Sequence, residues 1–539
     1  MCWKTATGSR ATRIFASIWN CHDPSPAKRI GPGASLLKQA VVVIHGMGEQ
    51  VPMQTLQDFV ESVWVTDDNL IRNARPDSMT GGPRQGNAVW YKPDERNRSF
   101  ELRRMTTEGL DGGREATDFY EFYWAHLMHG TTWEHFRTWL LDLLLRSPRR
   151  VPPSVRSAWI VLWVVTVLIA AGVLAAGILP AVYGEQLKAR CSPVAVVCWW
   201  PLLPSLVVGG LSLAFGTFVN VFLLKYFGDV ARYVKANPVN VARRQEIREK
   251  GVELLETLMG LRNDVGGTAI KYDRIVVVAH SLGTIVAYDI LSHCFARLNT
   301  RNNLRTNPAP QPHRVEMEAM IRRAAGLEGT GNAGPEWDLE AFQRLQALCR
   351  QEINAQDSPW TVSDLITLGS PLSHAEFLLA FDKADLRKAQ ERRTFPTCPP
   401  SLEYDGKTKR RHFTYRLTDE DEDNDSDPET PRLPHHAALF AFTRWTNLYS
   451  PHEKVLWGDL ISGEVGTQFN LAVNGREVSG IRDIKVLPER APDGQPVSGA
   501  RVPFFSHTKY WQSPGKAAGA GLPEHHIRVL RGALNLKSG

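Results

Sequence analysis

The stretch RIVVVAHSLG, Arg274–Gly283, decides the fold that the sequence predicts. Its apolar run, Ile275–Ala279, has the length and the β-branched content of a buried strand. The residues that follow, from Leu282 to Phe295, carry apolar side chains at helical spacing. A buried strand that reaches a helix through one short turn, with a serine on that turn, is the setting of a nucleophile elbow.

Ser281 stands at the centre of this turn. The backbone of such a turn is strained, so the neighbouring positions need small side chains. In the usual pattern, G-x-S-x-G, a glycine stands at both ends, whereas here Ala279 replaces the first glycine and adds one methyl group. We therefore predict that Ser281 is a nucleophile rather than an ordinary turn residue.

Other parts of the chain repeat the alternation of strand and helix. Near-continuous apolar strands that are separated by helices indicate a mostly parallel sheet with helices on both faces, which is an α/β fold. The predicted strands are AVVVIHG (40–46), TDFYEFYWA (117–125), SDLITLGSPL (363–372), TRWTNLYS (443–450) and IRDIKVL (481–487), and EHHIRVLRGAL (524–534) is predicted to be a helix.

Composition excludes several classes of protein. Of the 539 residues, 43% are hydrophobic and 22% are charged, so the chain can fold around a substantial core. The net charge of +6 is too small to indicate a nucleic-acid binder, and no zinc-finger or RNA-binding motif occurs. The seven cysteines form no C-x-x-C pair, which favours reduced thiols over a disulfide framework. Residues 1–36 are predicted to be a loosely ordered lead-in, because basic residues interrupt them and no signal-peptide core follows.

Two long runs contain no charged residue. They are SAWIVLWVVTVLIAAGVLAAGILPAVYG (157–184) and CSPVAVVCWWPLLPSLVVGGLSLAFGTFVNVFLL (191–224). A helix that crosses a bilayer needs about 20 apolar residues, and both runs exceed this length without the polar stripe of a surface helix. We predict two membrane spans, at about 158–183 and 202–224, that form a hairpin.

Basic residues orient this hairpin. The connecting segment EQLKAR (185–190) is short, so both outer ends emerge on the same side of the membrane. Basic residues are more frequent at the outer ends than in the connecting segment, and the positive-inside rule then places both soluble parts in the cytoplasm. These residues are Arg146, Arg149, Arg150 and Arg156 before the hairpin and Lys225, Arg232, Lys235, Arg243 and Arg244 after it, against Lys188 and Arg190 between the spans.

The hairpin divides the soluble core. We predict a first part of the core at 37–145, the hairpin region at 146–235 and a second part at 236–539. Within the second part, the polar stretch 297–359 is a candidate lid or insert. The stretch 418–434 is strongly acidic and contains prolines, and it is predicted to be a solvated, disordered loop.

A nucleophilic serine also needs hydrogen-bond donors for the oxyanion that its attack creates. The backbone amide of Leu282 supplies the first donor, and an early strand-to-helix loop is expected to supply the second. The segment VVVIHGMGEQ (Val41–Gln50) ends the first clear strand, and the amide of Met47 is its natural donor. The residues predicted to shape the two turns are His45, Gly46, Gly48, His280 and Gly283.

With these motifs the chain resembles the α/β-hydrolases, in their lipase and esterase branch. VVVIHGMGEQ, VVVAHSLG and LITLGSPL stand in the chain order of that family. The resemblance extends from about residue 40 to the C-terminus, apart from the hairpin and the two peripheral stretches. It implies an α/β-hydrolase fold that is interrupted by a transmembrane hairpin, with a triad in the order Ser, then Asp or Glu, then His.

The resemblance also implies where the acid and the base lie. The acid is expected in WTNLYSPHEKVLWGDLISG (445–463). Asp459 fits the family's turn after an N-L-Y strand, with a few inserted residues. Glu453 fits better the number of residues between that strand and the acid. We favour Asp459 and keep Glu453 as the alternative. The base is expected near the C-terminus, where His507 in FFSHTKYW resembles the family's histidine loop. His525 and His526 fall in a predicted helix and are poorer candidates.

These features together imply an integral, two-pass membrane protein whose catalytic part faces the cytoplasm. The expected activity is that of a serine hydrolase that cleaves a carboxylic ester, of a lipid or another acyl compound. A thioesterase or amidase on the same fold and an inactive membrane scaffold are the alternatives. No cofactor and no metal is expected, since His126 and His129 have no carboxylate partner motif and are expected to pack. The acyl group, the alcohol group and the oligomeric state stay open.

Overall fold

A computed structural model of the chain describes residues 37–46, 51–128 with gaps, 145–151, 238–262, 271–301, 310–328, 337–416, 432–450, 458–486, 503–512 and 525–537, with isolated positions between 156 and 234. Two of these ranges, 337–416 and 458–486, each omit one residue, 357 and 460. The lead-in 1–36 lies outside the described residues.

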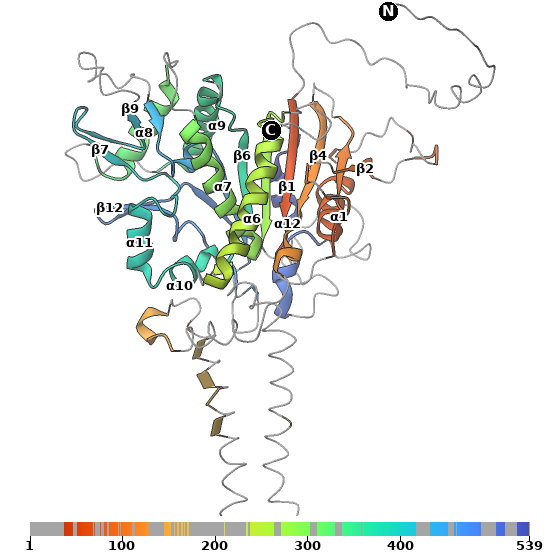
Figure 1. Ribbon diagram of the computed structural model, residues 1–539, viewed down its shortest axis with the longest axis horizontal. Coiled ribbons are helices and arrows are strands. Elements are labelled where there is room, and N and C mark those ends of the chain that lie inside the picture. The colour runs from red at the N-terminus through yellow and green to blue at the C-terminus, as the bar shows by residue number, and fades with distance from the viewer. Residues whose placement is uncertain are drawn as a thin grey trace, which may run out of the picture. The chain divides into compact units, whose positions relative to one another are not determined.

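A sheet of eight strands forms the centre of the protein (Figure 1). Six neighbouring strands, from β14 to β4, are parallel, and β3 and β2 extend the sheet antiparallel beyond β4. In spatial order the strands are β14 (Ile481–Lys485), β11 (Arg444–Tyr449), β6 (Val362–Leu368), β5 (Arg274–His280), β1 (Leu37–Ile44), β4 (Arg114–Phe122), β3 (Arg103–Thr107) and β2 (Val89–Pro93).

Helices cover both faces of the sheet. Successive side chains of a strand point to opposite faces, and alternate residues of β5 accordingly enter two separate cores. Val277 and Ala279 pack with helices α6 (Pro238–Leu258), α7 (Leu282–Arg301) and α9 (Leu339–Ala355). Val276 and Val278 pack with α1 (Gln54–Val60) and α12 (His525–Leu534).

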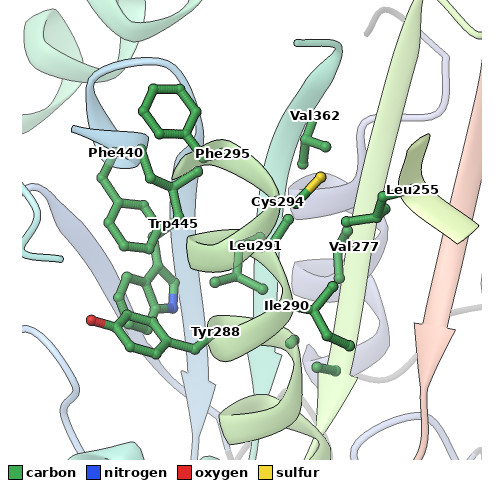
Figure 2. Packing of buried hydrophobic residues seen from close by; sticks show 14 of the residues in the cluster. Leu255, Val277, Tyr288, Ile290, Leu291, Cys294, Phe295, Val362, Phe440 and Trp445 are labelled. Carbon is green, nitrogen blue, oxygen red and sulfur yellow. The ribbon is translucent and has the colours of Figure 1, made fainter. Parts of the chain in front are cut away.

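Helix α7 makes the central contact with the first face. Figure 2 shows Leu291 and Cys294 of this helix directed toward the sheet, where Val277 and Val362 lie. Tyr288 of α7 meets Trp445 of β11, with ring centroids 5.7 Å apart. These contacts hold α7 against the strands, and Ser281 is the residue directly before this helix.

The predicted strands and the mostly parallel sheet are confirmed. Strands β2 and β3 were not predicted. Helices α8 (Pro312–Ala324) and α9 lie in the stretch 297–359, and α9 is part of the cover of the sheet. The prediction of a disordered loop at 418–434 is wrong for its last three residues, because Arg432–Pro434 form strand β10, paired with β9 (Thr414–Arg416). Residues 418–431 lie outside the described part.

The two predicted membrane spans fall almost entirely on residues that the structure does not describe. The described helical positions there are isolated ones between 156 and 171 and Gly210. Among the described residues, no helix combines the length and the apolar character that a membrane crossing requires.

Candidate active site

Ser281 occupies the turn between β5 and α7 with a φ of 53°. This left-handed conformation is uncommon for a residue other than glycine and marks a strained backbone. The Ser281 amide donates to the Leu368 carbonyl of the neighbouring strand, at 3.0 Å, and so anchors the turn to the sheet. The structure therefore has the sharp strand-to-helix turn that the sequence predicts at this serine.

Glycines let the turn after β5 meet the turn after β1. A Cβ atom on Gly283 would lie 2.3 Å from the His45 carbonyl oxygen, closer than any real contact. A Cβ atom on Gly46 would lie 2.9 Å from the Cβ of Ser281. Ala279, which replaces the first glycine of the usual pattern, is fully buried in the core, so its methyl group is accommodated.

His507 connects Ser281 to a buried carboxylate. Its Nε2 lies 2.8 Å from Ser281 Oγ, and its Nδ1 lies 2.8 Å from Asp459 Oδ2. His507 is carried by the short helix η8 (Pro503–Thr508), and Asp459 is only 1% exposed. The structure thus brings together three residues that lie far apart in the chain and that the sequence assigned to one site.

Tyr510 completes the surroundings of the acid. Its hydroxyl donates to Asp459 Oδ2 at 2.9 Å and accepts a hydrogen bond from the Ser450 amide at the end of β11. The second oxygen of Asp459 accepts from the Ile461 amide, also at 2.9 Å. Both oxygens of the carboxylate are therefore held in position.

The charge state of Asp459 follows from these contacts. Burial alone would raise the pKa of its carboxyl group, but the charge of His507 and the hydrogen bonds from His507, Tyr510 and Ile461 outweigh burial. The pKa of Asp459 is therefore held below its usual value. An ionised Asp459 orients the imidazole so that Nδ1–H points at the carboxylate and Nε2 faces the serine.

His280, the neighbour of the serine, supports the base from the other side. Its Nε2–H donates to the His507 carbonyl, at 2.6 Å, and its ring lies 4.8 Å from the Trp511 ring. Burial, reinforced by the nearby charge of His507, lowers the pKa of His280 to about 3. A neutral His280 therefore fixes the main chain of His507.

His45 has a similar role at the turn after β1. Its Nε2 accepts a hydrogen bond from the Trp124 amide, so Nδ1 carries the proton and donates to the Gly46 carbonyl at 2.8 Å. The Trp124 ring stacks on the imidazole and donates to the His45 carbonyl. Burial lowers the pKa of His45 to about 4, so the residue is a neutral brace of this turn.

Of the two predicted oxyanion donors, only Leu282 lies among the described residues. Leu282 is the first residue of α7, and the first amides of a helix have no partner within the helix and favour negative charge. Met47, Gly48 and the alternative acid Glu453 lie outside the described residues.

The remaining candidate histidines lie elsewhere. The ring of His126 stacks on Tyr123, with centroids 5.5 Å apart, and His129 is not described. His526 hydrogen-bonds the Gln512 carbonyl from helix α12, which also carries His525. Within the described ranges, no cluster of His, Cys, Asp and Glu could hold a metal ion.

Sequence reasoning did not assign Tyr510 and Gly369. Gly369 has a φ of 58°, and a Cβ atom there would lie 2.7 Å from the Tyr510 ring and 3.2 Å from Asp459 Oδ2. In the sequence, Gly369 is visible only as the start of a Gly-Ser-Pro turn and Tyr510 only as an aromatic residue three positions after His507. Neither pattern indicates that the residue lies against Asp459.

Chemically, the arrangement can move the Ser281 proton to His507 while Asp459 stabilises the resulting imidazolium. Comparisons of the chain with protein-family models, with curated proteins and with solved structures give no match.

Proposed function

We propose that this protein is a serine hydrolase with an α/β-hydrolase fold that cleaves a carboxylic ester through an acyl-enzyme. The observation that carries the proposal is the continuous chain of hydrogen bonds from Ser281 through His507 to the buried Asp459. The positive φ of the serine, at the end of a central parallel strand, supports it. The three residues also follow the chain order of that fold, with the acid after β11 and the base after β14.

The proposed reaction has two halves. Ser281 Oγ attacks the ester carbonyl carbon as its proton passes to His507 Nε2, and the carbonyl oxygen becomes an oxyanion that the Leu282 amide and a second amide, assigned to Met47, would bind. The tetrahedral intermediate expels the alcohol, which takes the proton from His507. Water then attacks the acyl-serine in the same way and releases the carboxylic acid.

We further propose that the two uncharged runs anchor the enzyme in a membrane, with its catalytic part on the cytoplasmic side. Both runs exceed the length that a bilayer requires, and the basic residues lie mainly outside the pair. An enzyme held at a bilayer meets apolar acyl compounds at high local concentration. The favoured substrate is therefore a lipid or another apolar acyl ester.

A fluorophosphonate probe tests the proposed chemistry, because it reacts covalently only with an activated serine. Wild-type protein should be labelled, and Ser281→Ala should lose labelling together with turnover of a short-chain p-nitrophenyl ester. Ser292→Ala is the matched control, since its hydroxyl on α7 only donates to the Tyr288 carbonyl. Wild-type protein that is not labelled would show an inactive scaffold, and labelling that survives in Ser281→Ala would place the nucleophile elsewhere.

A further inference from the structure

The chain approaches the two uncharged runs from the carboxyl end of the sheet, which is the end where the six parallel strands finish and where Ser281 lies. The last continuous described segment before the runs is Leu145–Val151, and Arg156, just before the first run, donates to the Val151 carbonyl. Arg146 of this segment donates to the Phe377 carbonyl at 2.8 Å, and its guanidinium lies 4.4 Å from the Phe377 ring. Phe377 belongs to α10 (Ala375–Leu378), which follows β6 through η6 (Pro371–His374) and therefore lies at the carboxyl end.

The chain also returns from the runs at this end. Helix α6 runs antiparallel to the strands, because its last residue, Leu258, accepts a hydrogen bond from the Tyr272 amide just before β5 begins. Its first turn consequently lies at the carboxyl end, and Figure 1 shows this turn and α10 at the same end of the sheet. Before α6, the buried Tyr233 donates to Asp289 of α7, and its ring lies 6.4 Å from that of Trp124, which follows β4.

Large apolar side chains are exposed at this same end. They come from loops that leave or enter the strands there: Val51 follows β1, Phe100 precedes the antiparallel β3, and Phe381 follows α10. Arg150 lies 4.3 Å from the ring of Phe381. The exposed fractions are 62% for Val51, 96% for Phe100, 72% for Leu145 and 53% for Phe381.

We propose that the carboxyl end of the sheet faces the bilayer, so that Ser281 receives its substrate directly from the membrane. Exposed apolar side chains together with arginines suit a surface of apolar lipid and anionic headgroups. The bilayer is favoured over a protein partner because two of the exposed residues, Leu145 and Phe381, lie at the entry to the two uncharged runs, where Arg150 contacts the Phe381 ring. Beside Phe381, Asp382 and Asp385 accept hydrogen bonds from the backbone at the start of α11 (Lys383–Glu391). The same helix carries the basic residues Lys383, Arg387 and Lys388, which offset these two acidic charges.

This orientation deepens, and rests on, the proposed ester hydrolysis, because it names the substrate as a lipid ester that is still in the bilayer. A cavity of about 640 Å³ extends from the end of β4 along the last two turns of α6. Phe100, Leu102, Phe122 and Leu254 give it an apolar lining, and charged groups come from Arg96, Glu101, Lys250 and Glu253. Such a cavity can hold part of an amphiphilic lipid.

Quenching by a nitroxide-labelled lipid tests the orientation in the full-length protein in lipid nanodiscs. A fluorophore is attached to Phe381→Cys, or, as the matched control, to Lys271→Cys at the amino end of the sheet. Both variants carry serine in place of Cys2, Cys21, Cys191 and Cys198, since the other cysteines are buried. We expect quenching at position 381 to be several-fold stronger than at 271, and equal or reversed quenching would overturn the orientation.

The same samples separate failure of the orientation from failure of the proposed chemistry. A fluorophosphonate label on Ser281 without differential quenching would contradict only the orientation. Differential quenching without the label would contradict only the hydrolase.

Turnover adds a second readout. Phe381→Asp should lower the ratio of hydrolysis of a vesicle-borne lipid ester to hydrolysis of a water-soluble ester by roughly tenfold. Leu261→Asp, an exposed apolar residue beyond the other end of α6, should keep the wild-type ratio. An unchanged ratio in Phe381→Asp would contradict direct uptake of substrate from the bilayer.

Discussion

Gly283 allows the turn after β5 to touch the turn after β1, and a single methyl group there tests that contact. In Gly283→Ala the new Cβ would meet two backbone carbonyl oxygens, of His45 at 2.3 Å and of Ile44 at 2.7 Å. Backbone atoms cannot move aside as a flexible side chain can, so we expect a loss of about 2–3 kcal/mol of unfolding free energy. Urea denaturation measures this loss. Gly532→Ala in α12, where a Cβ atom has open space, should be neutral or slightly stabilising, and equal stability of the two variants would disprove the close contact.

Asp459→Asn tests the assignment of the acid. An amide can donate to His507 Nδ1 and so favour the tautomer in which Nε2 no longer accepts the serine proton, and we expect kcat to fall by roughly 10³–10⁴-fold. Tyr510→Phe removes one of the hydrogen bonds to the carboxylate and should lower kcat by only about tenfold. Steady-state kinetics on a soluble ester separate the two. Glu453→Gln is the control. A large fall in kcat in Glu453→Gln, with kcat retained in Asp459→Asn, would show that Glu453 and not Asp459 is the acid.

Single residues differ in how far the sequence can predict them. Ser281 was predictable because its strand, its turn and its helix are contiguous, and His507 and Asp459 were predictable because the resemblance supplies their order. Tyr510 was not, since its role depends on Asp459 and on Ser450 at the end of β11, which approach it only in the folded chain.

At the level of elements, apolar runs predicted the buried strands but not the edge of the sheet. The side chains of β2 are almost all exposed, and β3 begins with two arginines. Edge strands of this kind lack the apolar run by which a central strand is recognised. The position of β2 and β3 beyond β4 is shown only by the strand pairing in the structure, β2 with β3 and β3 with β4.

The junction of β4 and α1 contains a buried carboxyl group whose titration should be measurable. Glu121 is fully buried, its Oε2 accepts from the Met53 amide before α1, and its Oε1 has no partner among the described residues. Burial, opposed in part by the Met53 hydrogen bond, raises the pKa of Glu121 from 4.5 to about 7. The folded protein therefore holds this proton more tightly than the unfolded chain, so Glu121 lowers stability as pH rises from about 4.5 to about 7.

Glu121→Gln removes this titration. Between pH 4.5 and pH 8, the unfolding free energy of the variant relative to wild type should rise by about 3 kcal/mol. Denaturation at a series of pH values measures the difference. Glu101→Gln, at an exposed glutamate, should show no such trend, and a constant difference for Glu121→Gln would mean that the carboxyl group titrates normally.

For the molecule as a whole, the sequence predicted that two uncharged runs separate two parts of one core, but not which end of the sheet the chain leaves and re-enters. That end depends on the direction of α6 and on the contact of Arg146 with α10, and both are products of the tertiary fold. The sequence also could not join the two parts of the core, whereas in the structure β1 and β4 of the first part pair with each other and β1 pairs with β5 of the second.

The positive-inside distribution makes a last prediction about this architecture. If both soluble parts lie in the cytoplasm, the connecting segment 185–190 lies on the opposite side of the membrane. Cys191 directly follows that segment, whereas Cys2 belongs to the N-terminal lead-in. The test uses a variant in which Cys191 is kept and Cys2, Cys21 and Cys198 are replaced by serine. A membrane-impermeant maleimide that is added to intact cells should then label this variant. The corresponding Cys2 variant should be labelled only after the membrane is opened. Labelling of Cys2 in intact cells would place the catalytic part outside, and protection of both cysteines until lysis would show that the connecting segment does not reach the outer face.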